Sequence, residues 1–224
     1  MSDGDSKPAP QPASQPLTLG AIFYEGFELL DVYGPLEMFG TVGEALRIVT
    51  VAERPGPVAS FQGPKTVADY GFDDCPPLDL ILLPGGMGTL AQLENEALLG
   101  FLRERAAAAR ATLSVCSGSA ILAKAGLLDG RRATSNKMYF SLATRQSDRV
   151  EWVKTARWVE DGPFVTSSGV SAGIDMALAV IERILGSERA EEIARFTEYE
   201  WHRDAGWDPF VAYLDDGSKA LGLV

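Results

Sequence analysis

The sequence predicts an α/β fold in which a mostly parallel β-sheet is covered by helices on both faces. Two observations carry this prediction. Strand-like and helix-like segments alternate along the chain after residue 16, an order that is typical of parallel sheets with helical crossovers. One strand-like segment, residues 79–83 (DLILL), is a continuous apolar run, as expected for a strand that is buried on both faces.

Each predicted element follows from its apolar pattern and from the turn residues that bound it. Gly63 and Pro64 interrupt a β-rich run and predict a hairpin. Pro35 suits the first turn of a helix, and Gly126 suits the end of another. The predicted strands are residues 17–24, 46–51, 79–83, 111–116, 132–135, 152–160 and 164–167, with the hairpin at 58–68. The predicted helices are residues 35–43, 95–110, 118–125, 137–144, 171–185 and 187–201.

We expect one domain over residues 17–224, preceded by a disordered tail at residues 1–16. The tail is rich in Pro and Ser and has no apolar core, a composition that fits disorder and does not fit a secretory signal. Residues 204–224 have little helix or strand character of their own. Aromatic residues are enriched at subunit interfaces, so we expect Trp201 and Trp207 to form a subunit contact.

Composition excludes several classes of function. The net charge of -11 argues against nucleic-acid binding, which needs clustered Lys and Arg. The sequence has no long uncharged apolar stretch, so we expect no membrane-spanning helix. Two cysteines and a single histidine provide neither a disulfide framework nor a metal-ligand pattern. We therefore expect a cytoplasmic protein that holds no metal and no cofactor.

Cys116 is the most informative residue of the chain. It follows the apolar run at 111–115 and precedes the small residues at 117–120, which predicts a tight strand-to-helix turn of the nucleophile-elbow type. At such a turn the helix N-terminus lowers the pKa of the thiol and directs backbone N–H groups toward a substrate. The alternative is a buried cysteine that acts as a small hydrophobe. The flanking glycine and serines favour the functional interpretation.

Two further segments should reach the same edge of the sheet, because sites in such sheets form at the carboxyl ends of the strands. Gly85 and Gly86 follow the DLILL strand and let backbone N–H groups approach a ligand, although a plain turn would also use them. Asp31 follows the first strand and lies between apolar residues. It is either a helix N-cap or a carboxyl group that exchanges protons with a substrate or orients the thiol.

The other titratable candidates fit structural roles better. Cys75 lies in a loop before Pro76 and lacks a helix N-terminus, so we expect no catalytic role for it. His202 is far from the elbow in sequence and fits a structural or interface histidine. A long-range pair with Cys116 stays open, because catalytic partners need not be neighbours in sequence.

Four segments together resemble the DJ-1/PfpI superfamily: LLDVYGP, LILLPGG, SVCSGSAILAKAGLLDGRRAT and SSGVSAGIDMAL. The resemblance covers about residues 17–200 and implies a flavodoxin-like α/β sandwich, usually dimeric, with a cysteine at a strained elbow. Within the family the chain is most similar to the isocyanide hydratase branch and to the amidotransferase-like domains of some transcription regulators. Asp31 matches the acid of that branch, and Ser117 stands where the hydratases carry a threonine.

Asn136 departs from the family pattern. It occupies the position after the RRAT strand where many relatives, including close hydratases, have a histidine. Members of the protease and deglycase types rely on a histidine near the cysteine, so the departure argues against proteolysis and suits a site built from a cysteine and an acid.

The resemblance implies cysteine-dependent hydration of isocyanides to N-substituted formamides in a homodimer. Cys116 would attack the isocyanide carbon, Asp31 would supply or relay the proton, and the loop at Gly85, Gly86 and Ser117 would position substrate or stabilise charge. Three alternatives stay open. They are a glyoxalase-type enzyme acting on small carbonyls, a redox-sensing or protective protein whose exposed low-pKa thiol oxidises readily, and a ligand-binding module with an inert cysteine. Candidate pocket residues that the sequence does not rank are Tyr33, Met87, Met138 and Tyr139.

Overall fold

The computed structural model describes residues 15–220 and 222, so most of the tail predicted at residues 1–16 lies outside the described residues. Its central feature is a six-stranded sheet in the order β2-β1-β5-β6-β10-β9. All neighbouring strands pair in parallel except β9, which runs antiparallel to β10. The sheet strands are β1 (Leu17–Ile22), β2 (Leu46–Val51), β5 (Leu80–Leu83), β6 (Ala111–Ser114), β9 (Trp158–Asp161) and β10 (Phe164–Ser167). The predicted mostly parallel sheet is confirmed.

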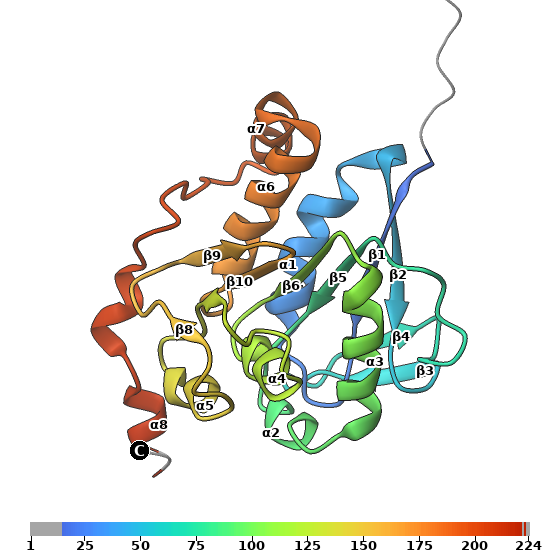
Figure 1. Cartoon of the computed structure of the whole chain (residues 1–224). Coiled ribbons are helices and arrows are strands. Elements are labelled where there is room, and N and C mark those ends of the chain that lie inside the picture. Colours follow the sequence, from blue (N-terminus) through green and yellow to red (C-terminus); the bar gives the residue numbers. More distant parts are fainter. Residues whose placement is uncertain (1–14, 221, 223–224) are drawn as a thin grey trace, which may run out of the picture.

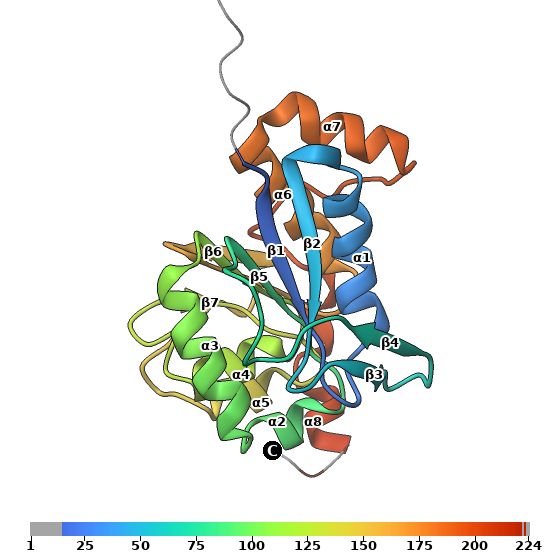
Figure 2. The same cartoon turned by 90° about the vertical axis from the view of Figure 1, so that its right-hand side faces the viewer.

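Helices cover both faces of this sheet, as the sequence predicts (Figure 1, Figure 2). One face carries α1 (Leu29–Gly40), α6 (Ala172–Leu185) and α7 (Ser187–Phe196), and the other carries α3 (Glu96–Ala108) and α4 (Gly118–Lys124). The four residues of β5 and the four of β6 are all buried. Their carboxyl ends lie side by side, because Leu83 pairs with Ser114.

The remaining elements are short. β3 (Gly56–Ala59) and β4 (Lys65–Ala68) form the predicted hairpin. β7 (Arg132–Ala133) pairs with β8 (Glu151–Trp152) in a separate two-stranded sheet. The short helical elements are η1 (Gly43–Ala45), α2 (Thr89–Gln92), α5 (Phe140–Thr144), η2 (Pro209–Tyr213) and α8 (Asp216–Ala220).

The predicted start of the first helix is wrong. Helix α1 begins at Leu29, and Pro35 lies inside it. Val32, Pro35 and Phe39 are all buried and recur at the i, i+3, i+7 spacing of one helix face. Burial of this face offsets the single backbone hydrogen bond that a proline removes from a helix. The earlier start places Asp31 in the first turn of α1.

The helix predicted over residues 187–201 ends at Phe196, five residues early. Glu198 has a φ of +51°. Its N–H donates to the Arg195 carbonyl, and the N–H of Tyr199 donates back to the Ala194 carbonyl at 2.9 Å. This is the Schellman pattern that ends a helix through a left-handed residue, here without the glycine that would have marked it in the sequence.

The strand predicted over residues 152–160 is also wrong, because it is divided between β8 and β9. Between them the chain leaves both ladders, and the N–H of Arg157 donates to the Ala205 carbonyl at 2.9 Å. The guanidinium of Arg157 is buried and bonds the Asp175 carboxylate at 2.6 Å. Pairing this buried charge decides the local path, because an unpaired buried guanidinium is costly.

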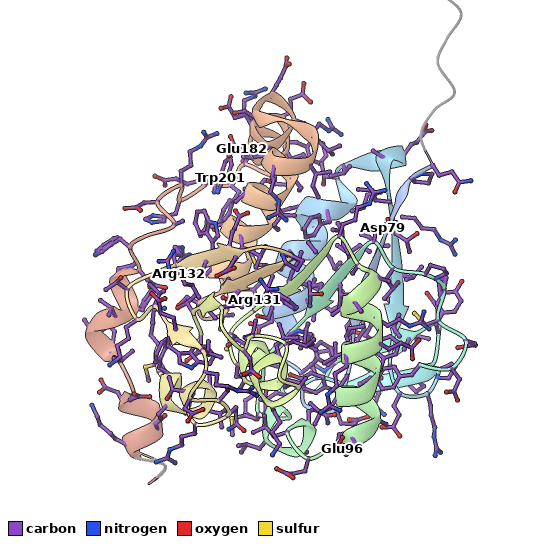
Figure 3. The ribbon with its side chains drawn as sticks, viewed as in Figure 1. Asp79, Glu96, Arg131, Arg132, Glu182 and Trp201 are labelled. Carbon is purple, nitrogen blue, oxygen red and sulfur yellow. The ribbon has the colours of Figure 1, made fainter. Side chains whose placement is uncertain are left out.

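Residues 204–220 contain two short helical elements, η2 and α8, that the sequence pattern does not predict. The Asp208 side chain accepts from the N–H of Phe210 and caps η2. Trp201 lies along α6, where its indole N–H donates to the Asp175 carbonyl at 3.2 Å (Figure 3). Trp207 has half of its surface exposed. The homodimer and the subunit contact at these two tryptophans stay predictions.

No helix in the described part of the chain combines the length and the apolar character that a membrane crossing requires.

Candidate active site

Cys116 lies at the turn between β6 and α4, and its backbone has a φ of +58°. A non-glycine residue in this left-handed region is strained. The strain is held by the surroundings, because the N–H of Cys116 donates to the Ser168 carbonyl at 3.0 Å. The hydroxyls of Ser119 and Ser135 both donate to the Cys116 carbonyl at 3.2 Å. The predicted nucleophile elbow is confirmed.

The loop after β5 packs directly against this elbow. A Cβ atom at Gly85 would lie 2.5 Å from both the backbone nitrogen and the hydroxyl of Ser117. Gly86 has a φ of +129°, and a Cβ there would lie 2.5 Å from the Glu28 nitrogen. Both glycines are therefore needed for the close approach of backbone segments within the protein, and their expected approach to a ligand stays a prediction.

Gly85→Ala should lower stability by about 2 kcal/mol and reduce any Cys116-dependent activity, because the added methyl group must push the loop away from the elbow. Gly100→Ala is the matched control. Gly100 lies inside helix α3 with open space around its Cβ position, so that alanine should raise stability by about 0.5–1 kcal/mol. Urea unfolding of both variants measures the difference. Equal stability of the two variants would contradict the packing argument.

Asp31 is fully buried in the first turn of α1. Its Oδ2 accepts from the N–H of Gly85 at 2.7 Å, and its Oδ1 has no hydrogen-bond partner among the described residues. Burial raises the pKa of this carboxyl group to about 8, although the Gly85 N–H and the Cys116 thiol act in the opposite direction. This shift favours the protonated form of Asp31 at neutral pH. The N-cap position belongs to Glu28, so the capping interpretation of Asp31 is wrong.

Cys116 is 7% exposed. Burial raises the pKa of its thiol, and negative charge on the neighbouring Asp31 carboxyl group, where that group is ionised, raises it further. The backbone N–H groups of Ser117 and Val170 and the Asn136 amide lower the pKa, but by less. The prediction of a low thiol pKa is therefore wrong, because desolvation at this site raises the pKa by more than these hydrogen bonds lower it.

Asn136 is a direct hydrogen-bond partner of the Cys116 sulfur. Its Nδ2 donates to the Cys116 Sγ at 3.0 Å, and its Oδ1 accepts from the N–H of Tyr139 at 3.0 Å. The sequence marks Asn136 only as a departure from the family pattern and does not predict the contact. The second bond fixes which amide atom faces the sulfur.

Asn136→Leu should slow alkylation of Cys116 by iodoacetamide about tenfold at pH 8, because the thiolate loses a hydrogen-bond donor. Asn136→Asp should slow it further, since a carboxylate adds negative charge beside the sulfur. The rate is measured in a Cys75→Ala background. Asn95→Asp, at the N-cap of α3, is the control and should react like the parent. An unchanged rate in Asn136→Leu would exclude this role of the amide.

Cys116 lines a small, mostly apolar cavity of about 200 Å³. Met87 and Tyr139 line it, whereas Tyr33 and Met138 do not. Val170 also lines it, with a φ of +43° that is unusual for a β-branched residue; no sequence signal marks this strain. The lining residues are Glu28, Phe61, Gly86, Met87, Leu90, Cys116, Ser117, Asn136, Tyr139, Leu142 and Val170.

The two loop amides are already used within the protein. The N–H of Gly85 donates to Asp31, and the N–H of Gly86 donates to the Ser117 hydroxyl at 3.2 Å. The expected use of the Gly86 amide as a free donor toward substrate is therefore not the resting arrangement. The Ser117 N–H acts on the Cys116 sulfur.

His202 and Cys75 lie outside this cavity. The backbone N–H of His202 donates to Asp175 at 2.9 Å, and its ring lies 6.2 Å from that of Trp207. Cys75 is buried, and its carbonyl accepts from Arg105. Neither side chain is brought to Cys116. Among the described residues no three His, Cys, Asp or Glu side chains converge in a metal-binding group.

Comparison with known sequences also identifies the family of this chain. The sequence profile described as the DJ-1/PfpI family matches residues 20–183. The chain belongs to the DJ-1/PfpI family. An isonitrile hydratase of Pseudomonas putida is 35% identical over 82% of this chain and 78% of its own length; isonitrile is a synonym of isocyanide.

Two further relatives are a protein of known structure and a transcriptional regulator. A THiJ/PfpI family protein of Pseudomonas syringae has a crystal structure that matches with a TM-score of 0.79 at 30% identity, over 97% of this chain and 94% of its own. The HTH-type transcriptional regulator GbdR of Pseudomonas aeruginosa is 30% identical over 83% of this chain. The chain spans about half the length of that regulator, 51%.

Proposed function

We propose that this DJ-1/PfpI protein hydrates isocyanides to N-substituted formamides by covalent catalysis at Cys116. One observation carries the proposal: a buried carboxyl group with a pKa of about 8 interacts with a buried thiol beside a small apolar cavity. An isocyanide, R–N≡C, is a small apolar molecule whose terminal carbon accepts both a proton and a nucleophile. The similarity to the isonitrile hydratase supports the same chemistry.

The first step forms a thioimidate. Protonated Asp31 gives its proton to the terminal carbon, and the Cys116 sulfur bonds to that carbon. The thiol proton passes to the Asp31 carboxylate, so that R–N≡C and the thiol become R–N=CH–S–Cys with no net change of charge. This order suits the raised pKa values of both groups, because each group carries a proton at neutral pH.

The second step releases the product. Water adds to the thioimidate carbon, its oxygen forming the new C–O bond, and the nitrogen takes a proton. The C–S bond then breaks, the sulfur regains a proton, and R–NH–CHO leaves. The whole cycle adds one water to one isocyanide and returns Cys116 and Asp31 to their starting states. Asp31 serves as the proton relay in both steps.

The site fits the alternatives less well. A redox sensor needs an exposed thiol with a low pKa, whereas Cys116 is buried and its pKa is raised. Glyoxalase chemistry starts from a polar, hydrated carbonyl, whereas apolar side chains dominate the cavity wall.

Turnover of p-nitrophenyl isocyanide by the wild-type protein tests the proposal. We expect N-(4-nitrophenyl)formamide, detected by liquid chromatography, and no comparable conversion of methylglyoxal to lactate. Lactate without formamide would replace the proposal by glyoxalase-type chemistry. No product from either substrate would remove the hydratase assignment.

A further inference from the structure

Three buried hydroxyl groups form a chain from the core to the wall of the cavity. The Tyr24 hydroxyl bonds the Pro84 carbonyl at 2.8 Å and the Thr89 hydroxyl at 3.2 Å. The Thr89 hydroxyl bonds the Ser117 hydroxyl at 2.9 Å. Tyr24 is 6%, Thr89 0% and Ser117 5% exposed. Only Ser117 reaches the cavity.

The direction of every hydrogen bond in this chain follows from counting donors. A carbonyl oxygen only accepts, so the single proton of Tyr24 goes to Pro84. The Thr89 hydroxyl must then donate to Tyr24, and the Ser117 hydroxyl must donate to Thr89. Burial raises the pKa of Tyr24 well above its usual value and keeps its proton in place. Reversing the chain would leave the buried Pro84 carbonyl without this partner, which is unfavourable.

Ser117 lines the cavity, and with its proton directed to Thr89 its hydroxyl oxygen can act there only as an acceptor. Its proton is held by Thr89, and one of its lone pairs accepts from the N–H of Gly86 at 3.2 Å. A hydroxyl oxygen has two lone pairs, so one remains for a group that donates an N–H or O–H. A substrate carbon or an isocyanide nitrogen cannot use it, whereas a water molecule can.

We propose that Tyr24 and Thr89 are positioning residues that hold the Ser117 hydroxyl as the hydrogen-bond acceptor for the water of the second step. The inference rests on the proposed function. The Ser117 oxygen accepts a hydrogen bond from one O–H of the water. This turns the water oxygen toward the thioimidate carbon, which is bonded to the sulfur of the preceding residue, Cys116. No proton is lost from Ser117, because its own proton stays with Thr89. Formation of the thioimidate needs no water and does not depend on the chain.

The variant Thr89→Val tests whether the hydroxyl chain acts in the second step and not in the first. Valine keeps the shape of threonine and removes the acceptor for the Ser117 proton, which frees that proton to turn into the cavity and repel the water's O–H. We expect kcat for p-nitrophenyl isocyanide to fall about tenfold or more with KM unchanged or lower. Intact-protein mass spectrometry during turnover should show Cys116 heavier by one isocyanide. Thr89→Ser keeps the hydroxyl and should restore kcat without the adduct.

Controls separate this role from a structural one. Thr197→Val makes the same change at the end of α7, where the hydroxyl bonds only its own helix and the Met38 sulfur, and should turn over like wild type. Tyr24→Phe removes the acceptor of the Thr89 proton, so that this proton can turn to the Ser117 oxygen and displace the Ser117 proton into the cavity. This variant should also accumulate the adduct, which covers the case in which Thr89→Val does not fold.

The outcomes distinguish a failure of this inference from a failure of the proposed function. Adduct accumulation in Thr89→Val or Tyr24→Phe supports the inference. Unchanged kcat, or a fall in kcat without adduct in a folded variant, overturns it while the proposed function stands. Absence of formamide from the wild-type protein overturns the proposed function and this inference with it.

Discussion

Cys116→Ala should abolish isocyanide turnover, with a loss of at least 10³-fold, roughly the contribution of a covalent nucleophile. The alanine leaves no atom that can bond the isocyanide carbon. Asp31 and the cavity alone offer acid catalysis without an intermediate. The measurement is formamide production from p-nitrophenyl isocyanide under saturating conditions, with enzyme in excess where turnover is slow.

The second cysteine provides the matched control for this variant. Cys75 is buried near Arg105 and does not line the cavity, so Cys75→Ala should retain full turnover. If Cys116→Ala formed formamide at the wild-type rate, the covalent mechanism would be wrong, whatever the identity of the catalyst.

Asp31→Asn should lower turnover by about 10²–10⁴-fold, the usual contribution of a positioned acid or base. The asparagine side chain can still accept from the N–H of Gly85, but it has no proton to give at neutral pH. Glu37→Gln, an exposed change on the same helix, should leave turnover unchanged. Wild-type turnover should fall as the pH rises through about 8, because Asp31 then loses its proton. A variant as active as wild type would exclude Asp31 as the relay.

The same substitution should stabilise the protein at alkaline pH. The pKa of Asp31 is about 8 in the folded state against 3.8 for an ordinary aspartate, so the folded protein keeps a proton that the unfolded chain releases between these values. The stability from this group is complete below the lower pKa and is lost as the pH rises toward the higher one. An amide does not ionise and escapes the loss.

Thermal unfolding of Asp31→Asn and wild type measures this effect. We expect the Tm of the variant to exceed that of wild type by at least about 5 °C at pH 8.5, because each pKa unit corresponds to about 1.4 kcal/mol, a domain of this size gains about 2–4 °C per kcal/mol, and the pKa of Asp31 is shifted by more than one unit. The difference should shrink at pH 4.5. A Tm difference that is independent of pH would contradict a buried, protonated Asp31.

The central sheet and the elbow were predictable because their signals are local or topological. The apolar runs ending at Leu83 and Val115 each predict a buried strand, and parallel neighbours bring their carboxyl ends together. The glycines after Leu83 and the small residues after Cys116 have the backbone freedom that this close approach requires. Their adjacency needed no knowledge of side-chain contacts.

The errors came from places where distant residues compete with a local preference. Pro35 suits a helix start, but burial of the face it shares with Val32 and Phe39 carries α1 through it. Helix α7 ends at a left-handed Glu198 in place of the usual glycine. The pairing of buried Arg157 with Asp175 divides a run that otherwise favours one strand.

The sequence by itself determined the α/β architecture, the family, and the identity of Cys116 and Asp31 as candidate reactive groups. Only the tertiary structure decided the direction of their pKa shifts, the contact of Asn136 with the sulfur, and the direction of the hydroxyl chain ending at Ser117. The physical reason is that apolar patterns and turn residues act over a few neighbours. Desolvation and hydrogen bonding depend on what surrounds a group in space, and here those surroundings come from segments up to 139 residues apart, as Asp31 and Val170 around Cys116 illustrate.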